Sequence, residues 1–424
     1  MKFISVEQAI EKKKGSVDIR GWIYRIRKLK DKVFIVLRDS SEIIQCIVKD
    51  PSLVKISDKL LVESSIEISG KIYKDKRAPT GYEIEVKKLN IVHVAEDFPI
   101  GKDQSPEFLL DKRHLYLRSR KLTASLKIRS NVLWALQEYI RKLGFIEAEA
   151  PSFSGSASEG GSEVFEFNYF GKKAFLTQSW QFYAENFIFP FEKVYALAPS
   201  FRAEKSKTSR HLTEFWHLEI EQAWANVDDL MNIAEKSIEY TIKEIIKKNK
   251  KELELLNVDI TNLKKIKTPF PRIKHSEAIK LLNKKGFKIK KENDLGTLEE
   301  KALTEHFGTF LFVTNYPLKI LKFYHGEDPK EPKTGMNFNL LAPKIGEVVD
   351  GSQREPDLNK IKERLKKDKI ALGAADWYLD SRRFGSVPHA GFGLGTERLI
   401  QFICNLDNIK DAIPFPRTMT RLTP

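Results

Sequence analysis

The segment VYALAPSFRAEKSKTSRHLTEFWHLEIEQAW (194–224) decides the fold, because its pattern predicts two strands joined by a long basic loop. Successive side chains of a strand point to opposite faces. One face of the second strand is apolar, and we expect it to pack on a core. The other face carries an aromatic ring, an imidazole and two carboxylates, namely Phe215, His217, Glu219 and Glu221.

The loop of this hairpin gathers side chains that suit a nucleotide. Arg202 and Glu204 precede it, and its cationic residues are Lys205, Lys207, Arg210 and His211. Such a hairpin could hold a triphosphate, because arginines neutralise phosphates, Phe215 could stack on a base, and carboxylates bind a metal or an amine. Periodicity alone leaves open a structural hairpin with surface ion pairs.

A second segment, HAGFGLGTERLIQFICNL (389–406), predicts a strand that runs into a helix. Gly391, Gly393 and Gly395 alternate along the strand and would let a ligand approach the backbone closely. Arg398 lies in the first turn of the helix. The glycine pattern by itself is weak, because it lacks the GxGxxG spacing of a dinucleotide site.

The N-terminal region predicts a small barrel. Strand-like runs separated by short polar turns cover residues 18–26, 33–39, 42–48, 63–73 and 82–92, which fits an OB-like fold. A polar stretch then indicates a linker, and apolar spacing predicts a helix over 126–144 with Gly144 at its C-terminal cap. Because the rest mixes helices and strands without βαβ alternation, we expect an α+β fold with an antiparallel sheet flanked by helices.

Composition favours a globular protein of the cytoplasm. The 424 residues suggest two or three domains, and no run is apolar enough for a membrane span or a signal peptide. Cys46 and Cys404 are far apart, which argues against a zinc cluster or a disulfide framework and favours a reducing compartment. The net charge of +15 fits a polyanion partner and a lysine-rich surface equally well.

Together, the motifs resemble the three signatures of class II aminoacyl-tRNA synthetases. They are FRAE (201–204) with RHLTEFWHLEIE (210–221), GFGLGTERL (391–399), and a helix that ends before Pro151. The residues of these motifs are similar to those of the subgroup that has an N-terminal OB-fold anticodon-binding domain. That subgroup handles aspartate, asparagine and lysine. Three long motifs in the right order make this resemblance highly specific.

The resemblance covers nearly the whole chain, from GWIYRIR (21–27) to FPRTMTRLTP (415–424). It implies an OB-fold anticodon-binding domain at 1–97, a linker at 98–122 and a class II catalytic domain at 123–424.

ATP-dependent activation of an amino acid is the reaction that the resemblance implies. Arg202 would contact the α-phosphate and Arg398 the γ-phosphate, and Phe215 would stack on adenine. The other implied ATP-binding residues are Glu204, Arg210, His211, Glu347 and Gly395. The substrate carboxylate would attack the α-phosphorus in line, so catalysis would rest on positioning and charge neutralisation.

The pocket must select the amino acid. In the aspartate enzymes a motif like QLYKQ supplies a lysine for the side-chain carboxylate, whereas QFYAENF (181–187) has Ala184 at that position. A buried carboxylate would lose its partner there, so a neutral amide suits the pocket better. The line EFWHLEIE also resembles the asparagine enzymes, particularly the archaeal type. We therefore expect L-asparagine as substrate and tRNA(Asn) as acceptor.

The resemblance also assigns the contacts to the amino acid. Glu219 would accept a hydrogen bond from the asparagine amide, and Arg354 would hold the α-carboxylate or the amide oxygen. Glu159 would bind the α-ammonium group from a mobile loop, although it could also be an ordinary exposed carboxylate. Gln178 and Gln181 would line the same pocket.

Magnesium is the implied cofactor. The family draws its ligands from an aspartate and a glutamate, and this chain has Asn339 at the first position and Glu347 at the second. Our hypothesis is that Asp350, where a glycine is usual in the asparagine enzymes, replaces the missing carboxylate. Alternatively, Asp350 is a solvated turn residue, and Glu347 holds the metal together with the phosphates.

The tRNA contacts are expected on the barrel. Members of the family place a phenylalanine and a glutamine, like Phe34 and Gln45, against the middle uridine of the anticodon, while basic residues such as Arg25 hold the backbone. Without the resemblance, Phe34 would be read as core. In this class the helix at 126–144 and the turn that follows form a homodimer interface, although the sequence does not separate such a contact from core.

Three rival functions stay open. The same chemistry with aspartate, alone or with asparagine, is opposed by Ala184. A paralogue that only binds tRNA or nucleotides is supported by Asn339 and opposed by the intact Arg202 and Arg398. An amide synthetase built on the same adenylating core is made less attractive by the retained anticodon-type barrel.

Overall fold

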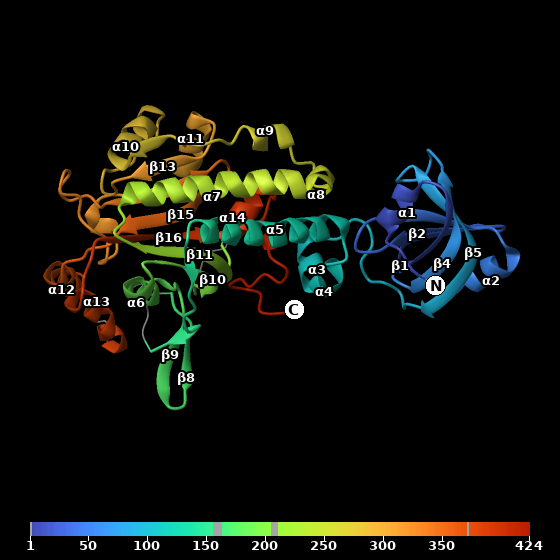
Figure 1. Ribbon diagram of the computed structural model, residues 1–424, viewed down its shortest axis with the longest axis horizontal. Coiled ribbons are helices and arrows are strands. Elements are labelled where there is room, and N and C mark those ends of the chain that lie inside the picture. Colours follow the sequence, from blue (N-terminus) through green and yellow to red (C-terminus); the bar gives the residue numbers. More distant parts are fainter. Residues whose placement is uncertain (1, 156–162, 205–210, 371–372) are drawn as a thin grey trace. The chain divides into compact units, whose positions relative to one another are not determined.

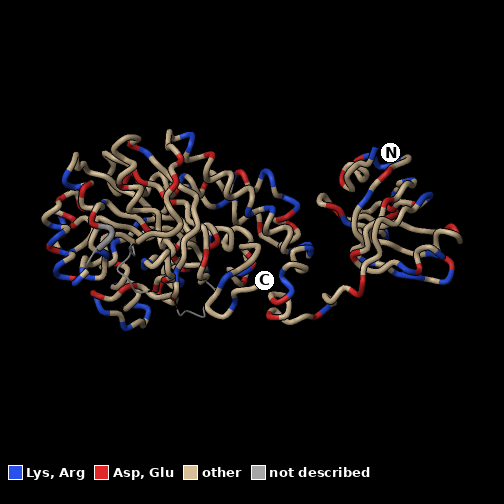
Figure 2. Tube along the Cα trace, turned by 90° about the horizontal axis from the view of Figure 1, so that it is seen from below, with Lys and Arg blue, Asp and Glu red and all other residues tan. Residues whose placement is uncertain are grey.

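The computed structural model describes residues 2–155, 163–204, 211–370 and 373–424. The chain forms two compact units, Met1–Leu109 and Leu110–Pro424, which are described separately below (Figure 1). Figure 2 shows lysine and arginine along the trace of both units, interleaved with aspartate and glutamate. Among the described helices, none combines the length and apolar character that crossing a bilayer requires.

The first unit is the predicted closed barrel, with strand order β1-β2-β3-β5-β4. The strands are β1 (Gly15–Lys28), β2 (Val33–Arg38), β3 (Ile43–Val48), β4 (Ser65–Lys74) and β5 (Tyr82–His93), and the helices are α1 (Val6–Lys12) and α2 (Pro51–Ser57). On β2, Val33, Ile35 and Leu37 are fully buried in the barrel core. Phe34 alternates with them and is half-buried on the outer face, so it is not a core residue.

Residues 98–122, predicted as a linker, contain two short helices, α3 (Pro106–Asp111) and α4 (Arg113–Tyr116). Arg113 is 1% exposed and donates hydrogen bonds to the main-chain oxygens of Lys410, Ile413 and Pro414. It also pairs with the carboxylate of Asp411 at 2.8 Å. This part of the segment is therefore built into the second unit.

The second unit is built on an eight-stranded sheet in the order β12-β13-β14-β15-β16-β11-β10-β6. The strands are β6 (Ile146–Glu147), β10 (Lys193–Phe201), β11 (Glu214–Ala223), β12 (Arg272–Lys274), β13 (Leu311–Thr314), β14 (Asn337–Ala342), β15 (Gly346–Gln353) and β16 (His389–Gly395). The pairs between β13 and β10 are antiparallel, whereas the edge pairs β12–β13 and β6–β10 are parallel. The predicted antiparallel sheet is confirmed, with parallel strands added at its edges.

Helices cover both faces of this sheet (Figure 1). On one face, α5 (Arg120–Lys142), α7 (Val227–Lys248) and α14 (Thr396–Ile403) pack in the main core, which includes Leu218 and Ile220 of β11. On the other face, α6 (Gln181–Phe191) packs against Val194 and Ala196 of β10. The side chains of the 194–224 hairpin thus alternate as predicted. One face packs in the core, and the other face is available to bind a ligand.

Helix α5 starts at the N-cap Ser119, earlier than predicted, and ends where Gly144 adopts a left-handed φ of 84°. Its apolar stripe, Ile128, Val132, Leu136 and Ile140, is fully buried in the chain's own core. The regular spacing of this stripe is therefore explained by packing within one chain.

The remaining elements surround this framework. The helices are α8 (Lys250–Leu255), α9 (Ile260–Lys264), α10 (His275–Lys284), α11 (Thr297–Phe307), α12 (Leu358–Lys367) and α13 (Asp380–Arg383). The 3₁₀ helices are η1 (Leu318–Ile320), η2 (Gly373–Leu379) and η3 (Ile409–Ala412). A small sheet contains β7 (Phe153–Ser154), β9 (Lys172–Leu176) and β8 (Glu166–Tyr169).

Candidate active site

A cavity of about 390 Å³ opens on the face of the sheet that carries α6. It brings together side chains from α6, β11, β15, β16, α14 and the turns that follow β10 and β15. The lining includes Gln178, Gln181, Arg202, Glu204, His211, Phe215, Glu219, Glu347, Asp350, Arg354, Gly395 and Arg398. These residues were all singled out from the sequence, whereas Glu159 and Arg210 lie outside the described residues.

Strand β11 forms the floor of the cavity. Its apolar face packs in the core, so Phe215, Glu219 and Glu221 project from the other face into the cavity. Glu221 lies opposite Gly391 on β16, and a Cβ atom at position 391 would be 1.9 Å from the Glu221 carboxylate. Gly391 is therefore required because any side chain would collide with this carboxylate.

One end of the cavity is cationic. The Arg202 guanidinium lies 5.5 Å from the centre of the Phe215 ring, and its Nη1 atom is 3.6 Å from the Glu204 carboxylate. His211 lies 3.7 Å from the same carboxylate. An aromatic face capped by a guanidinium can stack a base, and the neighbouring cation can contact phosphate.

A neutral imidazole lies beside this end. Burial, together with the charges of Arg202 and Arg398, lowers the pKa of His217 well below its ordinary value. Its Nδ1 atom is 3.1 Å from the Ser200 hydroxyl, and its ring packs edge-on against Phe215. His217 therefore fixes the aromatic platform without adding charge.

Arg398 and Glu347 form a second polar group in the cavity. The Nη1 atom of Arg398 donates to the main-chain oxygen of Glu347 at 2.8 Å and lies 3.3 Å from its carboxylate. Asn339 donates from Nδ2 to the same carboxylate and lies opposite Asp350 across the β14–β15 pair. Glu347 and Asp350 both face the cavity.

The carboxylates of the cavity can serve as ligands of a magnesium ion. Among the described residues, no group of three or more His, Cys, Asp or Glu side chains converges as a metal site. Mg²⁺ is commonly held by one or two carboxylates together with substrate phosphates and water. Glu347 and Asp350, which line the same cavity as Arg202 and Arg398, fit that pattern.

The other end of the cavity surrounds Glu219. This carboxylate accepts hydrogen bonds from the Ser179 hydroxyl at 2.5 Å and from the main-chain N–H of Trp180 at 2.7 Å. Each oxygen of an ionised carboxylate can accept a further bond, so Glu219 keeps acceptor capacity toward the cavity. Gln178 is 4% exposed, and its Oε1 atom finds no hydrogen-bond partner among the described residues.

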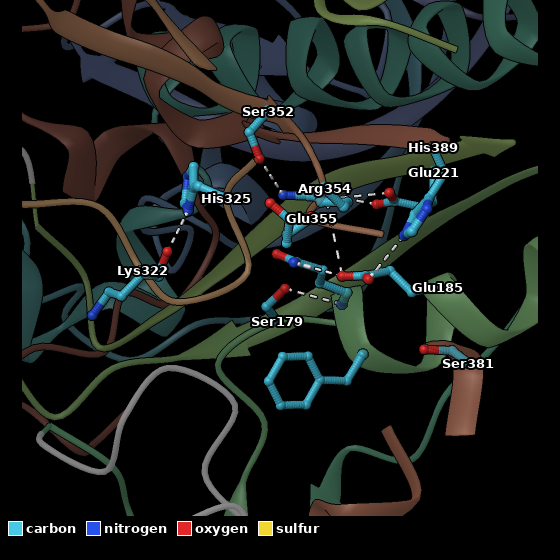
Figure 3. Close-up of polar contacts among 12 residues, drawn as sticks. Ser179, Glu185, Glu221, Lys322, His325, Ser352, Arg354, Glu355, Ser381 and His389 are labelled. Atoms are coloured by element: carbon cyan, nitrogen blue, oxygen red, sulfur yellow. Dashed lines mark hydrogen bonds and ion pairs between the residues drawn. The ribbon is translucent and has the colours of Figure 1, made fainter. Parts of the chain in front are cut away.

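Arg354 is held by a fork of two hydrogen bonds (Figure 3). Its Nε and Nη2 atoms donate to the two oxygens of Glu221 at 3.2 and 3.0 Å, and Nη1 donates to the Ser352 hydroxyl at 2.9 Å. Burial raises the pKa of Glu221, although Arg354 opposes this shift. The described contacts use three of the five N–H groups of Arg354, which leaves donors for a ligand.

Behind the cavity wall lies a buried charged cluster that the sequence did not reveal. Glu185 on α6 is fully buried and contacts Tyr378, Arg382 and His389. Burial alone would raise the pKa of Glu185, but Arg382, His389 and Arg354 hold it below its ordinary value. These residues come from distant segments that carry no shared motif, so no sequence signal could have joined them.

On the barrel, the predicted anticodon residues lie on adjacent strands of the outer face. Arg25 on β1 and Gln45 on β3 both lie opposite Val36 of β2, and Phe34 is two residues before Val36. The Gln45 amide donates to Glu83, and Lys32 lies 5.9 Å from the centre of the Phe34 ring. A half-buried ring on the outer face, an amide and basic side chains on one barrel face suit a splayed base.

Comparison with known proteins agrees with both units. Residues 105–419 match the family model for class II tRNA synthetases (D, K and N), and residues 17–92 match the OB-fold nucleic acid binding domain. The asparagine–tRNA ligase of Thermoplasma acidophilum is 45% identical over 97% of each chain.

Solved structures agree as well. Asparaginyl-tRNA synthetase from Pyrococcus horikoshii, in complex with asparaginyl-adenylate, superposes with a TM-score of 0.96 at 41% identity and covers 100% of each chain. The asparaginyl-tRNA synthetase of Entamoeba histolytica, also with asparaginyl-adenylate, has a TM-score of 0.88 at 29% identity over 97% of each chain.

Proposed function

The chain belongs to the class II tRNA synthetases of the D, K and N group, and we propose that it is an asparagine–tRNA ligase. It activates L-asparagine with ATP and transfers the amino acid to the 3′ end of tRNA(Asn). One observation carries this proposal: Arg202, Arg398 and Glu219 open on a single cavity whose wall has the uncharged Ala184. The cavity thus joins a phosphate site to an amide acceptor.

The arginines position ATP in the first step. Phe215 stacks on adenine, Arg202 contacts the α-phosphate and Arg398 the γ-phosphate, with Glu204, His211 and Gly395 beside them. Arg210, which lies outside the described residues, is proposed to act near the phosphates. The asparagine carboxylate attacks the α-phosphorus in line, and pyrophosphate leaves. Because the reacting groups are held in place and charge is neutralised, no side chain needs to act as nucleophile or base.

Asparagine is held at the opposite end. The Glu219 carboxylate accepts from the side-chain amide, and Arg354, fixed by Glu221, donates to the α-carboxylate or to the amide oxygen. Gln178 and Gln181 complete the pocket wall. Glu159 is proposed to bind the α-ammonium group and lies outside the described residues. In the second step, the 3′-hydroxyl of the tRNA attacks the acyl carbonyl of the adenylate, and AMP leaves.

Magnesium is proposed to accompany ATP, with Glu347 and Asp350 as its protein ligands. When bound, it would withdraw negative charge from the phosphates. The Asn339 amide supports this arrangement, because its hydrogen bond orients the Glu347 carboxylate without adding a third negative charge.

The tRNA anticodon is proposed to bind Phe34, Gln45 and Arg25 on the outer face of the barrel. The cytoplasm is the proposed site of this activity, since Cys46 and Cys404 are both buried free thiols, as suits a reducing compartment.

A homodimer is proposed as the working form. Strand β6 is the edge of the large sheet, and Ile146 on it is 45% exposed. An edge strand with an exposed apolar side chain is suited to contact a second copy. Sedimentation of the wild type and of Ile146→Asp tests this. A dimer that dissociates in the variant is the expected result, and a wild-type monomer would exclude it.

ATP–pyrophosphate exchange and tRNA charging, each with asparagine and aspartate, test the function. Exchange with asparagine followed by charging of tRNA(Asn) is the expected outcome. Faster exchange with aspartate than with asparagine would indicate an aspartate enzyme. Exchange without charging would indicate an amide synthetase, and no exchange would indicate a binding paralogue.

A further inference from the structure

The proposed reaction makes no use of the buried cluster behind the cavity wall. We call Glu185, Tyr378, Arg382 and His389 the Glu185 cluster. The Oε2 atom of Glu185 accepts from the Tyr378 hydroxyl at 2.8 Å and forms an ion pair with Arg382. The same oxygen lies 3.0 Å from His389 Nε2 (Figure 3). Burying a charge is costly unless it is paired, so four polar groups held away from water require an explanation.

The contacts of His389 orient its ring against the Glu185 carboxylate. Its Nδ1 atom lies 2.7 Å from the main-chain oxygen of Val387, and its Nε2 atom lies 3.0 Å from Glu185 Oε2. The imidazole therefore closes one side of the buried carboxylate and keeps it away from water.

The Glu185 cluster touches the cavity wall at two points. The Oε1 atom of Glu185 accepts from Gln181 Nε2 at 2.8 Å and lies 3.9 Å from Arg354 Nε. Gln181 and Arg354 both line the cavity, whereas Glu185 itself is fully buried behind them. A change at Glu185 therefore alters the surroundings of Gln181 and Arg354, although Glu185 itself does not line the cavity.

The charge of Glu185 lowers the positive charge of the wall behind Arg354. Its carboxylate forms an ion pair with Arg382 and lies 3.9 Å from Arg354 Nε, so it opposes two buried cations. Glu219, Glu221 and Glu355 are further buried carboxylates of this region. Without the charge of Glu185, the wall would be one unit more positive and would attract a second carboxylate of the substrate more strongly.

We propose that Glu185 is a positioning and specificity-determining residue, whose buried negative charge limits the cationic balance behind the pocket and so favours asparagine over aspartate. This inference rests on the proposed function, because it assumes that an amino acid binds beside Arg354 and Gln181. Lys322 also lines the cavity, but it is the same in every variant compared below.

The test is the ratio of kcat/KM for asparagine to kcat/KM for aspartate in ATP–pyrophosphate exchange. Glu185→Gln keeps the size of the side chain and removes its charge, so we expect this ratio to fall at least tenfold. A purely structural role would slow both substrates equally and leave the ratio unchanged. Where aspartate turnover is too slow to measure, its inhibition constant against asparagine replaces it.

Matched variants separate charge from hydrogen bonding. Tyr378→Phe removes one hydrogen bond to the same oxygen without changing charge, so its ratio should stay within threefold of the wild type. Glu185→Gln combined with Arg382→Met removes one charge of each sign, so its ratio should return toward the wild-type value. Circular dichroism and thermal melting confirm that each variant is folded.

If Glu185→Gln does not fold, the single variant Arg382→Met tests the proposal instead. It removes a cation and should shift the ratio in the opposite direction, further toward asparagine. A ratio within threefold of the wild type in Glu185→Gln, or an unshifted ratio in Arg382→Met, would overturn the proposal. Absence of exchange with asparagine in the wild type would instead refute the proposed function.

Discussion

Asn339 donates a 2.8 Å hydrogen bond from Nδ2 to the Oε2 atom of Glu347, so an uncharged amide stands next to the carboxylate proposed to bind magnesium. Asn339→Asp would place two carboxylates together, which repel each other when no cation is present. We expect this variant to melt at a lower temperature than the wild type in EDTA, and to gain more thermal stability from added Mg²⁺. Equal responses of both proteins to the metal would contradict this expectation.

Asp350 is the second proposed magnesium ligand. In Asp350→Asn, one of the two carboxylates is lost, so the Mg²⁺ concentration that half-saturates ATP–pyrophosphate exchange should rise about tenfold, which corresponds to about 1.4 kcal/mol. The exposed Asp368 provides the control, because Asp368→Asn removes the same charge from a residue that does not line the cavity. Unchanged magnesium dependence in Asp350→Asn would refute its role as a ligand.

Arg398 is held in one orientation by Glu347. Arg398→Lys keeps the positive charge but loses the planar fork of donors, so we expect exchange to slow by roughly 10- to 100-fold, since charge-assisted hydrogen bonds contribute about 1.5–3 kcal/mol. Arg272→Lys is the matched control, because Arg272 on β12 pairs with Asp228 on the surface. Comparable rates for both variants would argue against a phosphate contact by Arg398.

Phe34 lies on the outer face of β2, away from the barrel core. Phe34→Ala should leave ATP–pyrophosphate exchange unchanged and reduce the efficiency of tRNA charging by roughly 10-fold or more, because stacking of a base on an aromatic ring contributes about 1–3 kcal/mol. Val92→Ala serves as control, since Val92 on β5 is 63% exposed. Unimpaired charging by Phe34→Ala would exclude the anticodon contact.

His325 links stability to pH. Burial, followed by the charge of Arg354, lowers its pKa to about 3, so the folded protein keeps this ring neutral while the unfolded chain protonates it near pH 6.5. The unfolded state then binds more protons, and stability falls as pH drops from about 6.5 toward 3, by about 1.4 kcal/mol per pH unit. His325→Gln should flatten this dependence in urea unfolding between pH 7 and 5.

The exposed His306 is the control for that measurement. His306→Gln should retain the wild-type dependence of unfolding free energy on pH. A His325→Gln curve parallel to that of the wild type would show that the buried ring is not the source of the dependence.

The spacing of apolar and polar residues along the sequence predicted most of the fold. The alternation in 194–224 placed Phe215, Glu219 and Glu221 on one face, because a strand leaves each side chain only two directions. The barrel strands followed from the same rule. Helices α3 and α4 were missed, because α4 is held in place by main-chain oxygens about 300 residues away rather than by its own periodicity.

The site was predicted in part. Side chains that belong to long motifs, such as Arg202 and Arg398, meet in the cavity as expected. The Glu185 cluster could not be predicted, because its members are brought together only by tertiary packing between α6 and the segments before and within β16. Likewise, the hydrogen bonds that Ser179 and Trp180 donate to Glu219 could not be predicted, because they join a loop to a strand about 40 residues away.

The Arg113 contact implies an order of assembly for the second unit. Its acceptors lie 297 to 301 positions further along the chain, so α4 can dock only after nearly the entire unit has been synthesised. Closing so long a loop is entropically costly and slow compared with local pairing. Until the C-terminal segment is available the guanidinium stays hydrated, so the docking of α4 belongs to the late, long-range steps of folding.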